Sequence, residues 1–442
     1  MRQSIPLLVI VITYFGVGIL YVRQTPAWQS PDEPAHYNYV RQLADGRLPV
    51  MEWGDYDERY RNEVVSSRFA PEYDIAPITY EDWQPPLYYL LQTPVFLLSG
   101  GSLTAMRFIS LLLGAGVVVL AYVIARLLLP QQEWVGWSTA VLVAFLPQHL
   151  AMMASANNDA LAELLIAATL LLLLTWDQTP DSSRLLWWLG LLLGLGFLTK
   201  GTVYLMAPVI ALALAWQGWG QWRQLIRNGL RVFVPAFLLG ALWWGRNMAV
   251  YGGLDILGKT RHDAVVIGQI RTSEWVAHYG LDGTVARFLQ TTFNSFWGQF
   301  GWMAVPMPPW IYGLLLVMVV TAVTGLLLAP FVWPTDPGQP RGWLRRLPIS
   351  NLQFTILATL TLLTLALHVG YNLTFVQHQG RYLFPALIPL MLATAVGLGA
   401  WVIIVAEKIR QPRLPYLLPL SLGLALALLD LVALYRFIIP NL

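Results

Sequence analysis

Two adjacent carboxylates follow closely on the first long apolar run of the chain. Asp32 and Glu33 lie between Pro31 and Pro34, shortly after the run Ile5–Val22. The prolines fix the local backbone, and a charge at the edge of a membrane is costly unless it is paired or used. A carboxylate held in this way is suited to general base catalysis. The alternative is a solvated turn that leads into a surface helix.

Rare polar side chains also gather near the ends of later apolar runs. They are Asn158, Asp159, Lys200, Arg246, His378 and Arg381. Such residues usually face the interior of a membrane bundle, where they mark a site or a pathway. A lipid-phosphate substrate requires cations that bind its phosphate and, beside them, a carboxylate that takes a proton. We therefore expect Asp32, Asp159 and Arg381 to line one cavity.

Three of these residues also have a purely structural explanation. Lys200 and Arg246 can extend to the lipid headgroups, and Asp159 can stabilise a helix at its N-terminus. The residue types alone leave both explanations open.

The sequence gives little indication of a metal site. His36 and His378 are expected to form hydrogen bonds. A zinc site is not expected, because no two histidines have the i, i+4 spacing that metal hydrolases use. A divalent cation on Asp32 and Glu33 is the alternative, and no cofactor is established. The chain has no cysteine, which excludes disulfides and thiolate ligands.

The elements that must position these residues are membrane helices. The chain of 442 residues is 57% hydrophobic and only 12% charged, unlike a soluble domain. We read about eleven apolar runs as spans, which predicts an all-α polytopic membrane bundle. The runs are Ile5–Val22, Leu103–Leu129, Val135–Met153, Ala160–Trp176, Leu185–Leu198, Val203–Trp216, Val232–Val250, Ile311–Val332, Leu352–Val369, Leu383–Ala406 and Tyr416–Tyr435. The net charge of +3, with arginines in loops beside the spans, does not indicate nucleic-acid binding.

Short basic segments set the expected orientation. Three of them fall on one side of the membrane, which should be cytoplasmic. They are residues 221–231, the loop with Arg341, Arg345 and Arg346, and residues 407–413. The N-terminus is then inside and the C-terminus outside, in the plasma (inner) membrane. We expect one membrane domain, residues 1–442, with an outward cap of loops 23–102 and 251–310. Short amphipathic juxtamembrane helices are expected in the cap, the first of them following Asp32.

The order of these motifs resembles a known superfamily. An Asp-Glu pair after the first span and a first outer loop that closes with Gln84-Pro85-Pro86-Leu87-Tyr88-Tyr89 are similar to the GT-C membrane glycosyltransferases. Within that superfamily, the pattern looks like protein O-mannosyltransferases and aminoarabinose transferases. Residues 30–39, 154–160, 295–312 and 377–389 resemble a bacterial branch of multi-span proteins. One departure is Gln84, because aminoarabinose transferases carry a lysine at the position before Pro-Pro. A phosphate contact from this loop, which also contains Tyr88, is therefore in doubt.

The resemblance implies an inverting transfer of a sugar from a polyprenyl-phosphate donor to an acceptor on the extracytoplasmic face. It implies that Asp32 is the general base and that Glu33 orients the acceptor or shares the proton. The second acidic position matches Asp159, with Asn158 and His36 on the same acceptor side. For the donor phosphate, the resemblance and the positive charges indicate Arg381, Lys200, Arg246 and His378. The acceptor, a glycan, lipid or protein, stays open.

Three other functions are compatible with the same residues. A lipid or polysaccharide transporter would use the buried charges as a path, but it should show inverted repeats, and no repeat is evident. A glycan ligase or polymerase would take a lipid-diphosphate donor instead. A silent scaffold would have no use for charges gathered at one face.

Overall fold

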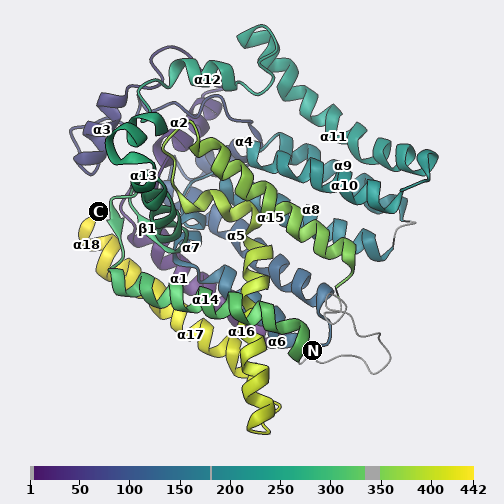
Figure 1. Ribbon diagram of the computed structural model, residues 1–442. Coiled ribbons are helices and arrows are strands. Elements are labelled where there is room, and N and C mark those ends of the chain that lie inside the picture. The colour runs from purple at the N-terminus through teal and green to yellow at the C-terminus, as the bar shows by residue number, and fades with distance from the viewer. Residues whose placement is uncertain (1–3, 180–181, 334–348) are drawn as a thin grey trace.

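Helices are the main elements of the computed structural model (Figure 1), which describes residues 4–179, 182–333 and 349–442. The predicted all-α membrane bundle is confirmed. The loop expected to carry Arg341, Arg345 and Arg346 lies outside the described residues.

Eight of the described helices are long and apolar enough to cross a membrane. They are α1 (Ser4–Gln24), α5 (Leu103–Leu128), α8 (Asp159–Gln178), α11 (Trp222–Tyr251), α14 (Pro309–Val332), α15 (Asn351–Asn372), η2 (Gly380–Ala386) continued by α16 (Leu387–Lys408), and the C-terminal series η3 (Leu414–Tyr416), α17 (Leu417–Val432), η4 (Ala433–Ile438) and α18 (Ile439–Asn441). Each contains one of the predicted apolar runs.

One further apolar run forms two helices with a sharp bend between them, and it counts as a ninth span only if the bent pair is taken as one. The predicted run Val135–Met153 forms α6 (Glu133–Ala144) and α7 (Pro147–Met153), whose axes differ by 65°. Pro147 has no backbone N–H and its ring would collide with the preceding turn, so one straight helix cannot continue through it. The break leaves α7 free to approach the cap end of the bundle.

The count of eleven spans is not confirmed. Two predicted runs form shorter helices, α9 (Ser183–Phe197) and η1 (Gly201–Leu205) continued by α10 (Met206–Gln217), which do not reach the length of a span. Helix α11 also begins at Trp222, within the segment 221–231 that the sequence suggested as a loop. Arginines on the exposed face of a helix lower the local hydropathy, which makes a helical start resemble a loop.

Small residues allow two of the long helices to pack closely. A Cβ on Gly325 of α14 would collide with the backbone of Gly397 in α16, and a Cβ on Gly397 would collide with Ala322. Close backbone approach of this kind is typical of helix pairs inside membranes, where dispersion contacts replace the hydrophobic effect. These contacts join α14 directly to α16.

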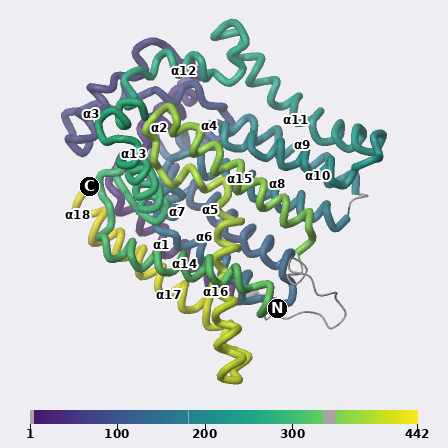
Figure 2. Tube along the Cα trace, in the orientation of Figure 1, coloured from purple at the N-terminus to yellow at the C-terminus, as the bar shows by residue number. Residues whose placement is uncertain are grey.

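The two long loops of the sequence form one cap at one end of the bundle. The first contributes α2 (Glu33–Ala44), α3 (Glu58–Ser66) and the start of α4 (Leu87–Leu98); the second contributes α12 (Lys259–Val265), α13 (Thr272–Trp297) and the strands β1 (Gln299–Phe300) and β2 (Val305–Pro306). Figure 2 shows α2 and α3 of the first loop near α12 and α13 of the second. A shared apolar cluster of Ala35, Met51, Val64, Ile78, Tyr80, Val265 and Val266 joins the two loops.

Candidate active site

Four charged side chains from distant parts of the chain meet beneath the cap. Arg381, in η2, places Nη2 2.5 Å from Oδ2 of Asp32, at the start of α2, and Nη1 4.0 Å from Oδ2 of Asp159, at the start of α8. Lys200, which precedes η1, places Nζ 2.5 Å from Oδ1 of Asp159. Opposite charges therefore alternate along the series Asp32, Arg381, Asp159 and Lys200. The structure brings together two carboxylates and two cations that the sequence singled out.

The cluster is shielded but can be reached from the surface. The side chain of Arg381 is 6% exposed, whereas those of Asp32, Asp159 and Lys200 are 18–23% exposed. Charge interactions in such a setting are stronger than in water because the surrounding dielectric is lower. Nε of Arg381 is buried without a hydrogen-bond partner among the described residues, so one donor of the guanidinium remains available for an anion.

Asp32 is held in a backbone conformation that L-residues rarely adopt. Its φ is 67° and its ψ is −6°, in the left-handed region, directly before the first residue of α2. Such a conformation costs free energy and persists only where the surroundings impose it, which is common at functional sites. Tyr80 donates a hydrogen bond of 2.9 Å to Oδ1 of Asp32. Together with Arg381, this contact fixes the direction of the carboxylate.

The electrostatic surroundings keep Asp32 ionised. Burial alone would raise the pKa of Asp32, but the Arg381 guanidinium and the hydrogen bonds from Arg381 and Tyr80 lower it to about 2. A carboxylate with so low a pKa is a poor proton acceptor while it remains paired. A base at this position gains strength only if another anion takes Arg381.

Glycine at position 380 is what lets Arg381 reach the cluster. A Cβ on Gly380 would collide with the backbone of Thr292 and Phe296 in α13. The Gly380 N–H donates a hydrogen bond of 2.7 Å to Oγ of Ser295, also in α13. Because η2 lies directly against α13, the next residue is placed at the base of the cap.

Glu33 points toward α5. Its carboxylate is fully buried and forms a salt bridge of 2.6 Å with Arg107 of α5, while backbone N–H groups of Trp28 and Ala156 donate to the same two oxygens. Arg107 also donates to backbone carbonyls at the end of α1. These contacts fix the backbone beside Asp32, and the expected role of Glu33, to orient the acceptor or share the proton, stays a prediction.

His36 and Asn158 lie together at one edge of the cluster. Nδ1 of His36 is 2.8 Å from the hydroxyl of Tyr89 in α4, and Asn158 donates to the same hydroxyl at 3.3 Å. Burial lowers the pKa of His36 to about 3, so its imidazole is neutral and suited to hydrogen bonding. Oδ1 of Asn158 is buried without a partner among the described residues, which leaves one polar atom for a ligand.

Two of the predicted phosphate ligands point elsewhere. Arg246 donates to the hydroxyl of Tyr251 and to a backbone carbonyl of the first loop, and its guanidinium lies over the ring of Trp243. The imidazole of His378 lies between the rings of Trp275 and Phe288. The structure does not bring either of them into contact with Asp32 or Asp159, and the phosphate role expected for them stays a prediction.

The end of the first loop supports the site without contributing a charge. The backbone carbonyl of Gln84 accepts a hydrogen bond from Tyr39, and the hydroxyl of Tyr88 pairs with Ser110 of α5. The ring of Tyr89 stacks on that of Tyr39 at 3.7 Å. This segment therefore holds α2 against α4 and α5, which is consistent with a loop that carries Gln84 in place of the lysine.

The divalent cation considered at Asp32 and Glu33 does not fit the geometry. The two carboxylates point to different arginines, Arg381 and Arg107. Within the described part of the chain, no group of three or more histidine, aspartate or glutamate side chains has the spacing of a metal site. The charges of the cluster are balanced by arginine and lysine.

Comparison with known proteins identifies the fold. The chain is similar to the oligosaccharyltransferase of Archaeoglobus fulgidus, with a TM-score of 0.54 and 14% identity over 97% of this chain and 53% of the other. It is also similar to ArnT from Cupriavidus metallidurans, with a TM-score of 0.50 and 14% identity over 99% of this chain and 74% of that one. The chain has a GT-C fold. The resemblance predicted from the sequence is thereby confirmed at the level of fold.

Sequence comparison covers a smaller part of this GT-C protein. Residues 83–244 match the family described as dolichyl-phosphate-mannose-protein mannosyltransferase. No curated protein matches the chain in sequence. The chain also spans only about half the length of the archaeal oligosaccharyltransferase, 53%.

Several residues at this GT-C site were not anticipated. Arg107 interrupts the apolar run of α5, and a charge within a span is a usable signal for a buried partner. Tyr80 and Glu81 had no such signal, because they belong to a loop rich in acidic residues. Burial, followed by repulsion from Asp32, raises the pKa of Glu81 to about 8. Glu81 is therefore mostly protonated at neutral pH and adds little negative charge beside Asp32.

Proposed function

We propose that the protein is a membrane glycosyltransferase that moves a sugar from a polyprenyl-phosphate donor to an acceptor at the cap end of the bundle. The observation that carries the proposal is the contact of Asp32 with Arg381 beside the pair of Asp159 and Lys200. The ArnT structure was solved with undecaprenyl phosphate bound, and the matching family is described by a dolichyl-phosphate donor. Both descriptions support a donor of the same class here.

In the proposed reaction, an acceptor hydroxyl attacks the anomeric carbon while the bond from that carbon to the phosphate oxygen breaks. The hydroxyl proton passes to Asp32, and the bonding electron pair stays on the polyprenyl phosphate. Arg381 and Lys200 stabilise the charge that develops there. Attack opposite the leaving group inverts the configuration at the anomeric carbon.

Donor binding also prepares the base. The donor phosphate competes with Asp32 for Arg381, and its capture of the guanidinium removes the main influence that lowers the pKa of Asp32. The carboxylate then becomes a stronger proton acceptor at the moment when the donor is in place. The donor is therefore expected to bind before proton transfer becomes efficient, which protects the free enzyme from unproductive reaction.

The acceptor side is assigned to Asp159, Asn158 and His36. Asn158 offers an unpaired amide oxygen, and neutral His36 is joined to Asn158 through the hydroxyl of Tyr89. We place this site on the extracytoplasmic face of the plasma membrane. A lipid-borne donor suits that face, since it needs no soluble nucleotide sugar there.

The test uses a deletion strain and mass spectrometry of its glycolipids and surface glycans. A product that is lost on deletion and restored by the wild-type gene identifies the sugar and the acceptor. Asp32→Asn should fail to restore it while inserting normally, because the neutral amide cannot take the proton. Glu63→Gln, an exposed carboxylate of α3, serves as the matched control and should restore the product. Full restoration by Asp32→Asn would overturn the proposed mechanism.

A further inference from the structure

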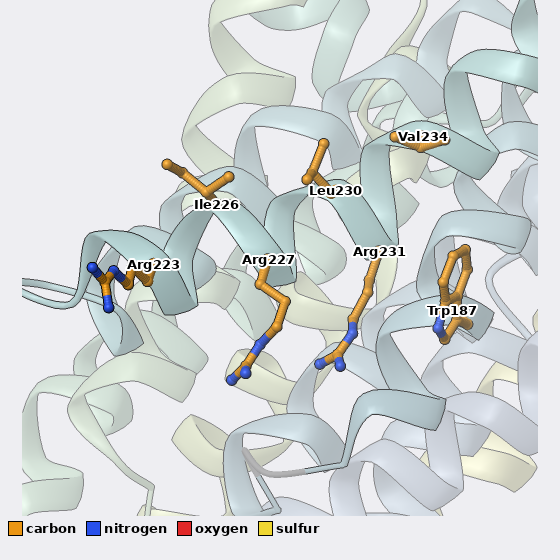
Figure 3. A pocket seen from close by; sticks show the side chains of 7 residues that line it. All are labelled: Trp187, Arg223, Ile226, Arg227, Leu230, Arg231 and Val234. Carbon is orange, nitrogen blue, oxygen red and sulfur yellow. The ribbon is translucent and has the colours of Figure 1, made fainter.

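A groove along the first turns of α11 is separate from the candidate active site. It has a volume of about 530 Å³ and is lined by Arg223, Arg227, Arg231, Ile226, Leu230, Val234 and Trp187. Six of these residues belong to α11, and Trp187 comes from the neighbouring α9 (Figure 3). This volume is in the range of small-molecule sites in proteins.

The groove combines a basic row and an apolar row of side chains. Arg223, Arg227 and Arg231 recur at intervals of four residues, so they lie on one face of α11 over about 12 Å. Figure 3 shows Arg227 and Arg231 extending in the same direction from the helix. The second row, Ile226, Leu230 and Val234, has the same spacing and is largely exposed. One ligand that meets both rows must have an anionic end and an apolar body.

Among the described residues, the three arginines have no carboxylate partner, and only Arg231 has a long side-chain contact, 3.5 Å to Asn228. Like charges at i, i+4 on a helix repel one another. Since no acidic residue lies in the first turn of α11 either, the positive charge of this row favours an anionic ligand.

Exposed tryptophans place this end of α11 at a membrane surface. Trp187, Trp216, Trp219 and Trp222 are 50–85% exposed around the α10–α11 turn. Tryptophan is enriched at the headgroup layer, where its ring meets apolar chains and its N–H meets water. The arginine row therefore lies at the depth of lipid phosphates.

We propose that this groove binds an anionic glycerophospholipid of the surrounding membrane. Its phosphate is bound by Arg227 and Arg231, and one acyl chain lies along Leu230 and Val234 against Trp187. The charge complementarity favours an anionic lipid over a zwitterionic one, because a choline headgroup would bring a cation to the arginines. The bound lipid would also bridge α9 and α11. This site does not depend on the proposed transfer reaction, because it lies at the opposite end of α11 from the cap.

The experiment is native mass spectrometry of the full chain in detergent. The protein is incubated with an equimolar mixture of phosphatidylglycerol and phosphatidylcholine that carry identical acyl chains. The wild type should retain phosphatidylglycerol preferentially. A basic residue near a membrane surface contributes about fivefold to the binding of anionic lipid. The triple variant Arg223→Gln, Arg227→Gln, Arg231→Gln should therefore reduce that retention by about tenfold or more.

A matched control separates this groove from net charge. The triple variant Lys408→Gln, Arg410→Gln, Arg413→Gln removes the same charge from an exposed turn after α16 and should keep the preference. Trp187→Ala should weaken retention of both lipids by shortening the apolar wall. The proposal would be overturned if the wild type shows no preference between the two lipids, or if both triple variants lose phosphatidylglycerol equally. Displacement of phosphatidylglycerol by equimolar undecaprenyl phosphate would also overturn it.

Discussion

Replacing Arg381 by glutamine tests how the candidate base is controlled. The variant Arg381→Gln keeps much of the side-chain volume but removes the charge that lies 2.5 Å from Asp32. Burial raises the pKa of Asp32, and Arg381 is the largest influence in the opposite direction; the net result is a fall from 3.8 to about 2. That difference corresponds to about 2.5 kcal/mol in favour of the ionised form. Without the guanidinium, burial dominates and the pKa of Asp32 should exceed 3.8.

The direction of the pH effect follows from this change. A base with a pKa of about 2 stays ionised as the pH falls, so the wild-type kcat/KM for the donor should show no acid limb from Asp32 above pH 3.8. In Arg381→Gln, an acid limb should appear above that pH, with a loss of about tenfold per pH unit below the pKa. The wild-type kcat should also show this acid limb. The kcat reports the pKa of Asp32 in the donor complex, where the donor phosphate holds Arg381 and the guanidinium no longer lowers that pKa.

The assay measures initial rates of sugar transfer in detergent or vesicles across a range of pH values, with the donor identified from the deletion strain. Arg59→Gln is the matched control, since it breaks an exposed arginine–glutamate pair in α3 and should leave both profiles unchanged. If the kcat/KM profiles of Arg381→Gln and the wild type have the same acid limb, Arg381 does not control the ionisation of Asp32.

Three further substitutions test the supporting contacts. Arg107→Leu leaves Glu33 buried and unpaired and should lower the free energy of unfolding by about 3–5 kcal/mol. SDS titration measures this change, and an unchanged unfolding midpoint would refute the prediction. Gly380→Ala forces η2 away from α13 and should reduce kcat/KM far more than it lowers the unfolding midpoint, whereas equal kinetics would show that the close approach is not needed. Lys200→Met should raise the apparent donor KM, while Lys259→Met, in an exposed pair, should not; equal KM values in both variants would exclude a phosphate contact by Lys200.

The sequence predicted the cluster because charges are rare beside membrane spans. Asp32, Asp159 and Arg381 each stand at the end of an apolar run, where a charge is costly without a partner. Their type and position therefore carried information, although the contact between Asp32 and Arg381 joins residues separated by 349 positions. Which carboxylate pairs with which cation depends on helix packing, and no local pattern reports that.

The departures from the sequence predictions have equally physical origins. Glu33 and Asp32 are neighbours, but the left-handed conformation of Asp32 turns their side chains to different partners, and a sequence does not display a positive φ at a non-glycine residue. The count of eleven spans is not confirmed, because the length and continuity of a helix decide whether it can cross a membrane. Pro147 breaks one apolar run into two helices, and α9 is apolar but too short to cross. Hydropathy measures composition along the chain and not where a helix bends.

The ion pair between Asp32 and Arg381 has a consequence for turnover. If the protein has the proposed function, the empty protein contains its own competitor for the donor, and the apparent donor affinity is reduced by the fraction of molecules in which the pair is closed. The same competition would favour release of the lipid phosphate after transfer, because the tethered carboxylate of Asp32 would replace the departing anion. The proposed enzyme would then need no other group to displace a water-insoluble product from its binding site.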